Sequence, residues 1–303
     1  MTTTTTHRLQ PTPPFDFAQT LGFLGGFTPT AGEQTVAAQS LTKAVRVQGE
    51  TAGFRLRSVG TVQVPELTCD LFAGASLLPE AEEAALKRIR FFLSLDEDLE
   101  PFYAVARQDL PFHGVLQRLY GYHQVKFLTP FENACWAILT QRTPGNVARG
   151  MKRRLVEAYG GSVQTPDGLL WAFPEPADLA AATSAELGEV VGNARKGEYL
   201  NAVVQAFGQT DERWLRQGPL GEVRTWLRGI HGIGEWSATF ILLRGLGRMD
   251  DPLPQDPDSL FVQEIMNAAS RVYGPLSADA LQAHACRYGV WQGYWAHYLR
   301  AAA

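Results

Sequence analysis

Apolar and polar residues alternate in short stretches between residues 43 and 64. The alternation comes from three pairs of residues that stand two positions apart: Val45 and Val47, Phe54 and Leu56, and Val62 and Val64. This is the period of a half-buried β-strand, and glycines separate the pairs, so the pattern predicts a small antiparallel sheet. From Pro79 the period lengthens, with Leu86, Ile89 and Leu93 on one face, which predicts a helix packed on that sheet.

Helical spacing continues from about residue 110 to the end of the chain. Apolar residues three and four positions apart form three faces: Phe131, Cys135, Ile138 and Leu139; Val147, Met151 and Leu155; and Leu200, Val203, Val204 and Phe207. Gly160 and Gly161 predict the end of a helix. Helix starts are predicted at Thr165-Pro166-Asp167, at Thr183 with Glu186, and at Ser277. The sequence therefore predicts an α+β unit, residues 1–108, followed by an all-helical unit, residues 109–303.

Composition places the chain among ordinary globular proteins. It has 303 residues, 45% of them hydrophobic, which is enough for two or three compact cores. Its net charge of −4 excludes a surface coated in positive charge, so any contact with nucleic acid is expected to be local. No stretch is suited to a signal peptide or to a membrane span, and no membrane contact is expected.

The three cysteines are Cys69, Cys135 and Cys286. They lie far apart and match no zinc or disulfide spacing, and an iron–sulfur cluster normally needs four thiolates. The sequence therefore predicts buried thiols in a reduced, cytoplasmic protein without an iron–sulfur cluster.

The strongest local pattern lies in residues 227–238, with Gly232, Ile233 and Gly234 at its centre. Two glycines allow a tight turn between helices and leave backbone amides accessible, so that a phosphate can approach the start of the second helix. This is the helix-hairpin-helix pattern, which grips the DNA backbone without reading its sequence. A glycine-rich turn without function is the alternative for these residues alone. The loop of residues 250–258 then brings two carboxylates, Asp256 and Asp258, to the start of the next helix.

The hairpin and the carboxylate after it resemble the helix-hairpin-helix (HhH-GPD) superfamily of DNA glycosylases. Within it, the chain is similar over nearly its whole length to the inducible bacterial 3-methyladenine DNA glycosylases. Matching segments are Pro13-Pro14-Phe15-Asp16-Phe17 with Leu21-Gly22-Phe23-Leu24, Phe131-Glu132 with Ala137-Ile138-Leu139-Thr140-Gln141, Arg244-Gly245, Leu253-Pro254, and Tyr288 with Trp291 and Tyr294. The resemblance implies an α+β amino-terminal domain like that of the TATA-binding protein, followed by an all-α glycosylase domain of two lobes with the active-site cleft between them.

The resemblance also implies an activity. A monomeric enzyme would hydrolyse the N-glycosidic bond of alkylated bases, such as 3-methyladenine and 7-methylguanine, in double-stranded DNA during base-excision repair. A DNA-binding protein without activity and a glycosylase for deaminated or oxidised bases are the alternatives.

Cleavage of the base–sugar bond builds positive charge on the sugar, so the chemistry requires a fixed carboxylate. By resemblance this carboxylate is Asp258, because Phe261 and the residues after it follow the pattern of the family's helix, and Pro257 would place Asp258 as its N-cap. Counting without gaps from Trp236 leads instead to Asp256, the second choice. Bifunctional relatives carry a Schiff-base lysine at the position of Trp236, so no lyase activity is expected.

The remaining site residues are also implied by the resemblance. The base pocket would be lined by Phe23, Trp236, Phe240 and Tyr288, whose rings suit a cationic methylated purine. DNA would be contacted by Gln141 and Arg142, at the family's wedge position, and by His231, Gly232, Ile233, Gly234 and Ser237 of the hairpin. Backbone carbonyls of Arg228, Ile230 and Ile233 would hold a structural Na⁺ or K⁺, and no other cofactor is expected. The basic residues Arg149, Lys152, Arg153 and Arg154 are either phosphate contacts or a solvated helix face.

Overall fold

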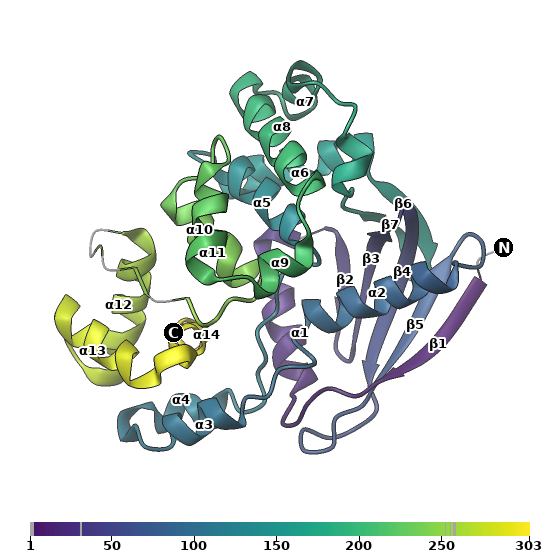
Figure 1. Ribbon diagram of the computed structural model, residues 1–303. Helices are drawn as coiled ribbons and strands as arrows, with labels where there is room; N and C mark the ends of the chain where they lie inside the picture. Colours follow the sequence, from purple (N-terminus) through teal and green to yellow (C-terminus); the bar gives the residue numbers. More distant parts are fainter. Residues whose placement is uncertain (1–2, 31, 252, 255, 257–258) are drawn as a thin grey trace.

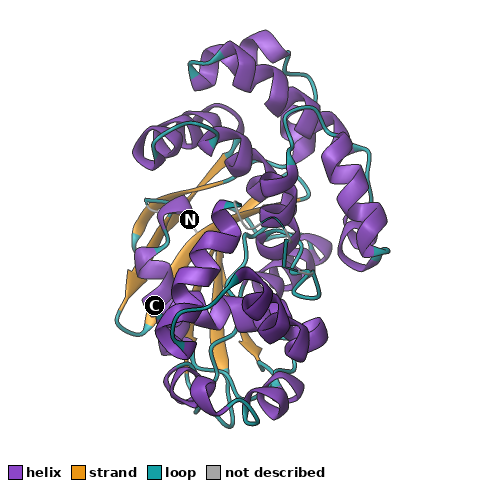
Figure 2. Cartoon of the chain, turned by 90° about the vertical axis from the view of Figure 1, so that its left-hand side faces the viewer, coloured by secondary structure: helices purple, strands orange, loops and turns teal. Residues whose placement is uncertain are grey.

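The computed structural model describes residues 3–30, 32–251, 253–254, 256 and 259–303 (Figure 1). The strands are β1 (Thr3–Leu9), β2 (Gln34–Ala37), β3 (Ser40–Val47), β4 (Glu50–Ser58), β5 (Leu67–Ala73), β6 (Gly161–Thr165) and β7 (Gly168–Ala172). The α-helices are α1 (Phe17–Gly26), α2 (Pro79–Phe92), α3 (Glu100–Ala106), α4 (His113–Arg118), α5 (Pro130–Thr140), α6 (Gly145–Tyr159), α7 (Ser184–Val191), α8 (Ala194–Gly208), α9 (Glu212–Gln217), α10 (Leu220–Gly229), α11 (Glu235–Arg244), α12 (Leu260–Tyr273), α13 (Ala278–Tyr288) and α14 (Gln292–Ala302). The strands gather in one part of the molecule, and helices make up the rest (Figure 2).

The amino-terminal part is a five-stranded antiparallel sheet in the order β1-β5-β4-β3-β2. The tightest hairpin joins β3 to β4 through Gln48 and Gly49, whose φ angles of 52° and 78° suit a turn that follows the twist of the strands. The predicted strands at Val45 and at Phe54 are confirmed. The threonine run, which has no apolar alternation, forms the edge strand β1 through its backbone.

The predicted strand at Val62 and Val64 is wrong. These residues lie in the loop between β4 and β5, where the amide of Thr61 donates to the carbonyl of Val64 at 3.0 Å. The loop closes tightly, since a Cβ on Gly60 would lie 2.3 Å from the same carbonyl oxygen. The third pair therefore marks a turn, and the next strand begins at Leu67.

The sheet is covered on both faces. Helices α1 and α2 pack on one face in a core that contains Val45, Phe54 and Ile89, which confirms the predicted helix from Pro79. The hairpin β6–β7 packs on the other face, with Val163 and Leu170 against Ala44. Because both faces are buried, β3 is buried along most of its length and does not alternate.

The β6–β7 hairpin corrects two predictions. Thr165-Pro166-Asp167 forms the hairpin turn and does not start a helix, so the part after residue 109 is largely but not entirely helical. The hydroxyl of Thr165 accepts the amide of Asp167 at 3.2 Å and donates to the carbonyl of Gly168 at 2.9 Å. A short polar side chain can close a turn in this way as readily as it caps a helix.

The helices pack around two cores. The first surrounds α5, which is buried on all sides and contacts α6, α8 and α11. The second joins α12, α13 and α14 to residues 99–122 (Figure 1). The predicted helical faces on α5 and α8 are confirmed, as are the capping box at Thr183 and the N-cap at Ser277. On α6 the prediction is right for Met151 and Leu155 but wrong for Val147, which is 45% exposed. The domain boundary after residue 108 stays a prediction, because α3 and α4 lie on either side of it and share the second core.

A buried ion cluster joins the helical part to the amino-terminal part. Lys152 on α6 is 1% exposed, and its Nζ donates to Glu132 on α5 at 2.7 Å and to Glu33 at 2.8 Å. Burial alone would raise the pKa of Glu132, but the charges of Lys152 and Lys43 outweigh it and hold this pKa below its usual value. Lys152 is therefore not a phosphate contact, which corrects one member of the predicted basic run.

The other members of the run face different surroundings. Arg154 donates to the carbonyls of Val190 and Val191 at 2.7 and 2.8 Å, so it holds the end of α7. Arg153 is exposed and lies 3.7 Å from Glu157 one turn along α6. Lys152 and Arg154 are thus structural, and for Arg149 and Arg153 both alternatives stay predictions.

Two of the three thiols are buried as predicted, and burial raises the pKa of Cys69 to about 12. Cys286 on α13 is exposed, which corrects the prediction for that residue. In the residues that the structure describes, no helix combines the length and the apolar character needed to cross a bilayer.

Because Lys152 and Glu132 are paired in the buried ion cluster, we expect their contributions to the free energy of unfolding to be strongly coupled. Lys152→Met should lower the free energy of unfolding by about 3–5 kcal/mol, because it removes the cation that is hydrogen-bonded to the buried carboxylate of Glu132. Lys152→Met combined with Glu132→Gln should recover part of that loss. Denaturant unfolding of both single variants and the double variant measures the coupling.

The same cluster gives a pH dependence with a defined sign. A lowered pKa in the folded state means that Glu132 stabilises the fold above its unfolded pKa of about 4.3 and that this contribution is lost as the pH falls through the folded value. The wild type should therefore lose more stability on acidification than the double variant. Equal losses in both proteins would contradict this role for the cluster.

Candidate functional site

Residues 230–234 join α10 to α11 in a compact turn. Ile230 and Ile233 are buried, and the amide of Ile233 donates to the carbonyl of Ile230 at 2.9 Å. The carbonyl of Gly234 accepts the amide of Ala238 at 2.9 Å and so begins α11. The two isoleucines anchor the turn in the core while its backbone stays near the surface.

The two glycines of the turn differ in what a side chain there would meet. Gly232 has a φ of +95°, and a Cβ there would lie 2.5 Å from Cγ of Tyr199 on α8. Gly234 has a φ of −92°, and a Cβ there would meet no atom within 4 Å. Gly232 is therefore fixed by packing, whereas Gly234 leaves open space in front of the first amides of α11.

Other predicted hairpin contacts differ in exposure. His231 is exposed and packs edge-on against Tyr199, with ring centroids 4.8 Å apart. The side chain of Ser237 is buried, like that of Ile233, so these two residues can offer a ligand only their backbone. Arg228 is exposed and lies 3.1 Å from Glu235.

The predicted wedge turn lies directly against the hairpin. Gln141, which ends α5, donates from Nε2 to the carbonyl of Gly232 at 2.7 Å. Arg142 is exposed and has a φ of 50°, an uncommon value for a residue with a side chain. Backbone strain of this kind is often held at functional positions.

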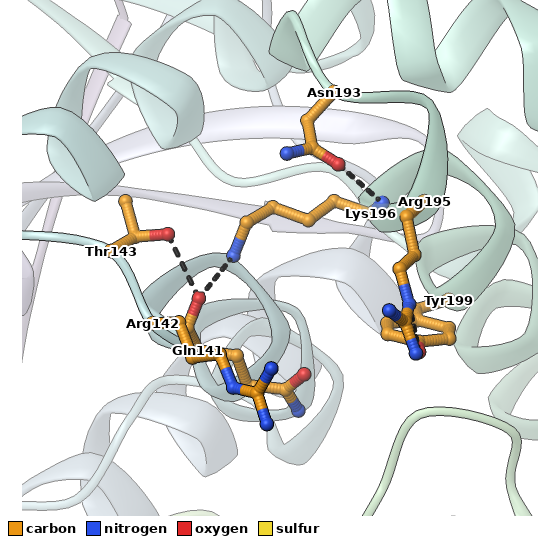
Figure 3. Close-up of a pocket in the computed structure, with 7 residues that line it drawn as sticks. All are labelled: Gln141, Arg142, Thr143, Asn193, Arg195, Lys196 and Tyr199. Atoms are coloured by element: carbon orange, nitrogen blue, oxygen red, sulfur yellow. Dashed lines mark hydrogen bonds between the residues drawn. The ribbon is translucent and has the colours of Figure 1, made fainter.

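Lys196 holds this turn in place, and nothing in the sequence analysis singled it out. Its Nζ donates to the carbonyls of Ile138 and Leu139, both at 2.8 Å. It also donates to the carbonyl of Gln141 at 3.0 Å, a bond drawn in Figure 3. These carbonyls form the end of α5, where a positive charge is favourable. Burial lowers the pKa of Lys196. A lysine in the first turn of a helix carries no sequence signal for such a distant cap.

Trp236 and Phe240 stack on α11 with centroids 5.3 Å apart and an angle of 14° between their rings. Trp236 is 45% exposed. The pair forms a wall shared by two hollows. One is an open aromatic hollow that also contains Phe23, Phe27 and Trp136. The other is a narrower cavity of about 100 Å³ that also contains Met249 and Phe261. The structure thus brings Phe23, Trp236 and Phe240 together, although Phe23 comes from the amino-terminal part.

Tyr288 does not join this group. It is 2% exposed, stacks on Trp295 with centroids 5.7 Å apart, and donates its hydroxyl to Asp109 at 2.9 Å. Burial and the neighbouring Tyr273 and Asp109 raise its pKa. Tyr288 lines neither hollow beside Trp236. Its ring is packed in the second helical core, where its hydroxyl is hydrogen-bonded to Asp109.

Arg244 is a half-buried cation behind the aromatic wall. Its guanidinium lies 4.8 Å from the ring centroid of Phe23 and 5.0 Å from that of Phe27. Burial lowers its pKa to about 10. These cation–π contacts bind α1 to the end of α11 and explain why Phe23 lies beside Trp236.

The predicted carboxylates lie in the loop between α11 and α12. Asp258 lies outside the described residues, and Asp256 is exposed. The N-cap of α12 is Ser259, so the helix begins one residue later than the prediction with Asp258 as its cap. Met249, which precedes residues 250–258 of this loop, and Phe261, which follows them, both line the cavity beside Trp236. The chain on both sides of this segment therefore lies at that cavity.

A third carboxylate anchors the start of the loop. Asp251 is buried and forms an ion pair with Arg224 of α10, which also reaches Glu235 and Thr239 of α11. Burial raises the pKa of Asp251, and Arg224 opposes that shift. Because Arg224 already neutralises it, Asp251 is a link between loop and hairpin and a poor candidate for catalysis. The sequence analysis did not single out this pair.

Comparisons with known proteins agree with this geometry. No family model matches the chain. The chain is 28% identical over 219 residues to DNA-3-methyladenine glycosylase of Bacillus subtilis, which covers 72% of this chain and 71% of that protein. It is 27% identical over 248 residues to DNA-3-methyladenine glycosylase 2 of Escherichia coli, covering 80% and 82%. The structure of 3-methyladenine DNA-glycosylase from Archaeoglobus fulgidus matches with a TM-score of 0.76 and 20% identity over 97% of each chain.

The chain is thus similar in sequence to DNA-3-methyladenine glycosylases over more than two thirds of its length, and it shares the fold of a solved 3-methyladenine DNA-glycosylase. This similarity confirms the resemblance drawn from the sequence. As in the prediction, the chain has an antiparallel sheet with helices, followed by a largely helical part that carries the hairpin.

The two hairpin glycines predict two different defects. Gly232→Ala should lower the free energy of unfolding by about 2–3 kcal/mol, because the new Cβ meets Tyr199 at a strained φ. Gly234→Ser should fold normally, since serine is a good N-cap, but should bind duplex DNA more weakly because a side chain then stands before the amides. Thermal unfolding and fluorescence-anisotropy titration measure the two effects.

Gly221→Ala on α10 is the matched control, because its Cβ also meets no atom within 4 Å and lies away from the turn. It should leave DNA affinity unchanged. If Gly234→Ser bound DNA as tightly as this control, the open face of the turn would not be the DNA contact.

Proposed function

We propose that this chain is a DNA glycosylase that hydrolyses the N-glycosidic bond of alkylated bases in duplex DNA, as a step of base-excision repair. The observation that carries the proposal is the aromatic hollow formed by Phe23, Trp236 and Phe240 next to the hairpin. The names of the relatives support the class of substrate.

The aromatic hollow suits a methylated purine. Methylation of a ring nitrogen places a formal positive charge on the base, which makes it both a good leaving group and a good partner for electron-rich rings. Contact with the exposed face of Trp236 would favour such a base by about 1–2 kcal/mol. The stacked Phe240 holds the Trp236 ring in position.

DNA is the proposed partner, and the nucleotide has to leave the duplex to reach the hollow. The amides of the hairpin around Gly234 would hold a phosphate of the bent strand. Arg142 would fill the gap in the base stack, because it is exposed on a turn fixed by Lys196 and by the bond from Gln141 to the hairpin. Its φ of 50° supports a side chain held outward for this purpose.

We propose Asp258 as the catalytic carboxylate and keep Asp256 as the alternative. A carboxylate about 4 Å from the cationic sugar would lower the barrier by about 4 kcal/mol at an effective dielectric constant near 20, or about a thousandfold in rate. Support comes from Met249 and Phe261, which line the cavity beside Trp236 on either side of the loop. The same carboxylate would orient the attacking water.

We also propose that the enzyme lacks lyase activity. Trp236 occupies the position of the Schiff-base lysine of bifunctional relatives. Without that amine, water is the nucleophile and an abasic site is the product.

A structural Na⁺ or K⁺ at the hairpin is compatible with the turn. The proposed ligands are the carbonyls of Arg228, Ile230 and Ile233. The carbonyl of Ile230 already accepts the amide of Ile233, but a carbonyl oxygen has a second lone pair for a cation. Such an ion would add positive charge near a bound phosphate.

Asp258→Asn should abolish base release from methylated duplex DNA, with a loss of about a thousandfold in the single-turnover rate. Asp256→Asn, two residues away, is the matched variant and should retain activity. Free methylated base measured by chromatography under enzyme excess gives both rates. Loss of activity in Asp256→Asn alone would show that the other aspartate is catalytic.

The product should be an intact strand that carries an abasic site. Denaturing gel electrophoresis should therefore show strand breaks only after alkali treatment. Breakage without alkali, together with covalent trapping by borohydride, would contradict the monofunctional mechanism. A panel that includes hypoxanthine and oxidised guanine tests the alternative substrate classes.

A further inference from the structure

The turn of residues 141–143 is a ridge between two hollows. On one side lies the aromatic hollow with Trp236 and Phe240, and on the other lies a cleft of about 470 Å³ against the start of α8. Thr143 lines both. A base that enters the aromatic hollow would thus leave the cleft on the far side of Arg142.

The second cleft is positively charged. Arg142, Arg195 and Lys196 line it, and none of the described residues that line it is acidic, although the whole chain has a net charge of −4. Lys196 donates to the end of α5, which leaves the two guanidinium groups to face the cleft. Within the described residues, neither arginine forms an ion pair with a carboxylate. We call this hollow the Arg195 cleft.

Arg195 is exposed but held in position. Its Nε donates to the hydroxyl of Tyr199 at 2.6 Å, and its guanidinium lies 5.5 Å from the ring centroid of the same residue (Figure 3). The Tyr199 ring in turn packs against Gly232 and His231 of the hairpin. The hairpin therefore fixes the guanidinium before any ligand binds, which reduces the entropy lost on binding.

We propose that the Arg195 cleft binds the phosphodiester backbone of DNA on the far side of Arg142 from the aromatic hollow. This contact is separate from the one made by the hairpin amides. The proposal rests on the proposed function, because DNA is the ligand. A fixed guanidinium with several N–H donors matches two phosphate oxygens at once. No carboxylate among the described lining residues would repel them.

Arg195→Gln tests the proposal through the salt dependence of binding to a short duplex with a tetrahydrofuran abasic-site analogue. One lost phosphate contact should reduce the slope of log affinity against log salt concentration by about 0.9. The dissociation constant at low salt should rise about five- to tenfold. Arg107→Gln is the matched control, because Arg107 is an exposed arginine that follows α3 as its C-cap and whose partner is Glu100. It should change neither quantity.

Tyr199→Phe separates positioning from simple charge. It keeps the ring against Gly232 but removes the hydroxyl that holds Arg195. Affinity should fall less than in Arg195→Gln, with the wild-type salt slope. In both variants the single-turnover rate of base release at saturating protein should be unchanged, and the protein concentration at half-saturation should rise.

An unchanged slope in Arg195→Gln, equal to that of Arg107→Gln, would overturn the proposal while leaving base release intact. If the wild type released no base but Arg195→Gln still showed the smaller salt slope, the proposed function would fail. The proposal that the Arg195 cleft binds a DNA phosphate would then still be supported. The two failures are therefore distinguishable.

Discussion

The backbone of Gly232 passes so close to the ring of Tyr199 that a Cβ at this position would lie 2.5 Å from its Cγ. This contact fixes the hairpin against α8. The carbonyl of the same glycine accepts a hydrogen bond from the side-chain Nε2 of Gln141, so the turn after α5 is fixed to the hairpin as well. Three segments distant in the sequence thus meet at one residue without a side chain.

The aromatic wall and the loop after it depend on this frame. Trp236 lies in the first turn of α11, two residues after the second hairpin glycine. The orientation of α11 therefore determines where its ring faces. Arg224 of α10 holds Asp251 at the start of the loop, and Arg244 at the end of α11 holds Phe23 of α1. Two half-buried arginines therefore connect the hairpin helices to the loop and to α1.

Positive charge is concentrated in one cleft of this protein, although the chain as a whole is negatively charged. A chain with a net charge of −4 has little general attraction for a polyanion, but a cleft whose described charged residues are all cationic retains a positive potential at short range. Such an arrangement suits an enzyme that has to leave undamaged DNA readily. Binding then depends on contacts formed only where the duplex can bend and release a base.

Much of the fold could be predicted from the sequence, because periodicity reports buried faces. The helices of the second part and the caps at Thr183 and Ser277 carry strong local signals. The threonine strand β1 and the hairpin at Thr165 were missed, since an edge strand needs no apolar face and a polar turn resembles a cap. These elements are determined by the sheet on which they pack.

The candidate site was predictable where a residue type has one physical use, as with the positive φ of Gly232. Tyr288 was misplaced because an aromatic residue can serve a pocket or a core, and only its bond to Asp109 distinguishes the two. Lys196 and Arg224 were missed because their partners are distant in the sequence. Long-range ion pairs and caps leave no local pattern.

The most direct measurement uses duplex DNA that carries a radiolabelled methyl group on its purines. The account predicts that the full chain releases the label as free methylated base and leaves abasic sites in unbroken strands. If the chain bound this DNA but the label stayed in the polymer, the protein would be a DNA-binding member of the fold and the catalytic claim would be wrong.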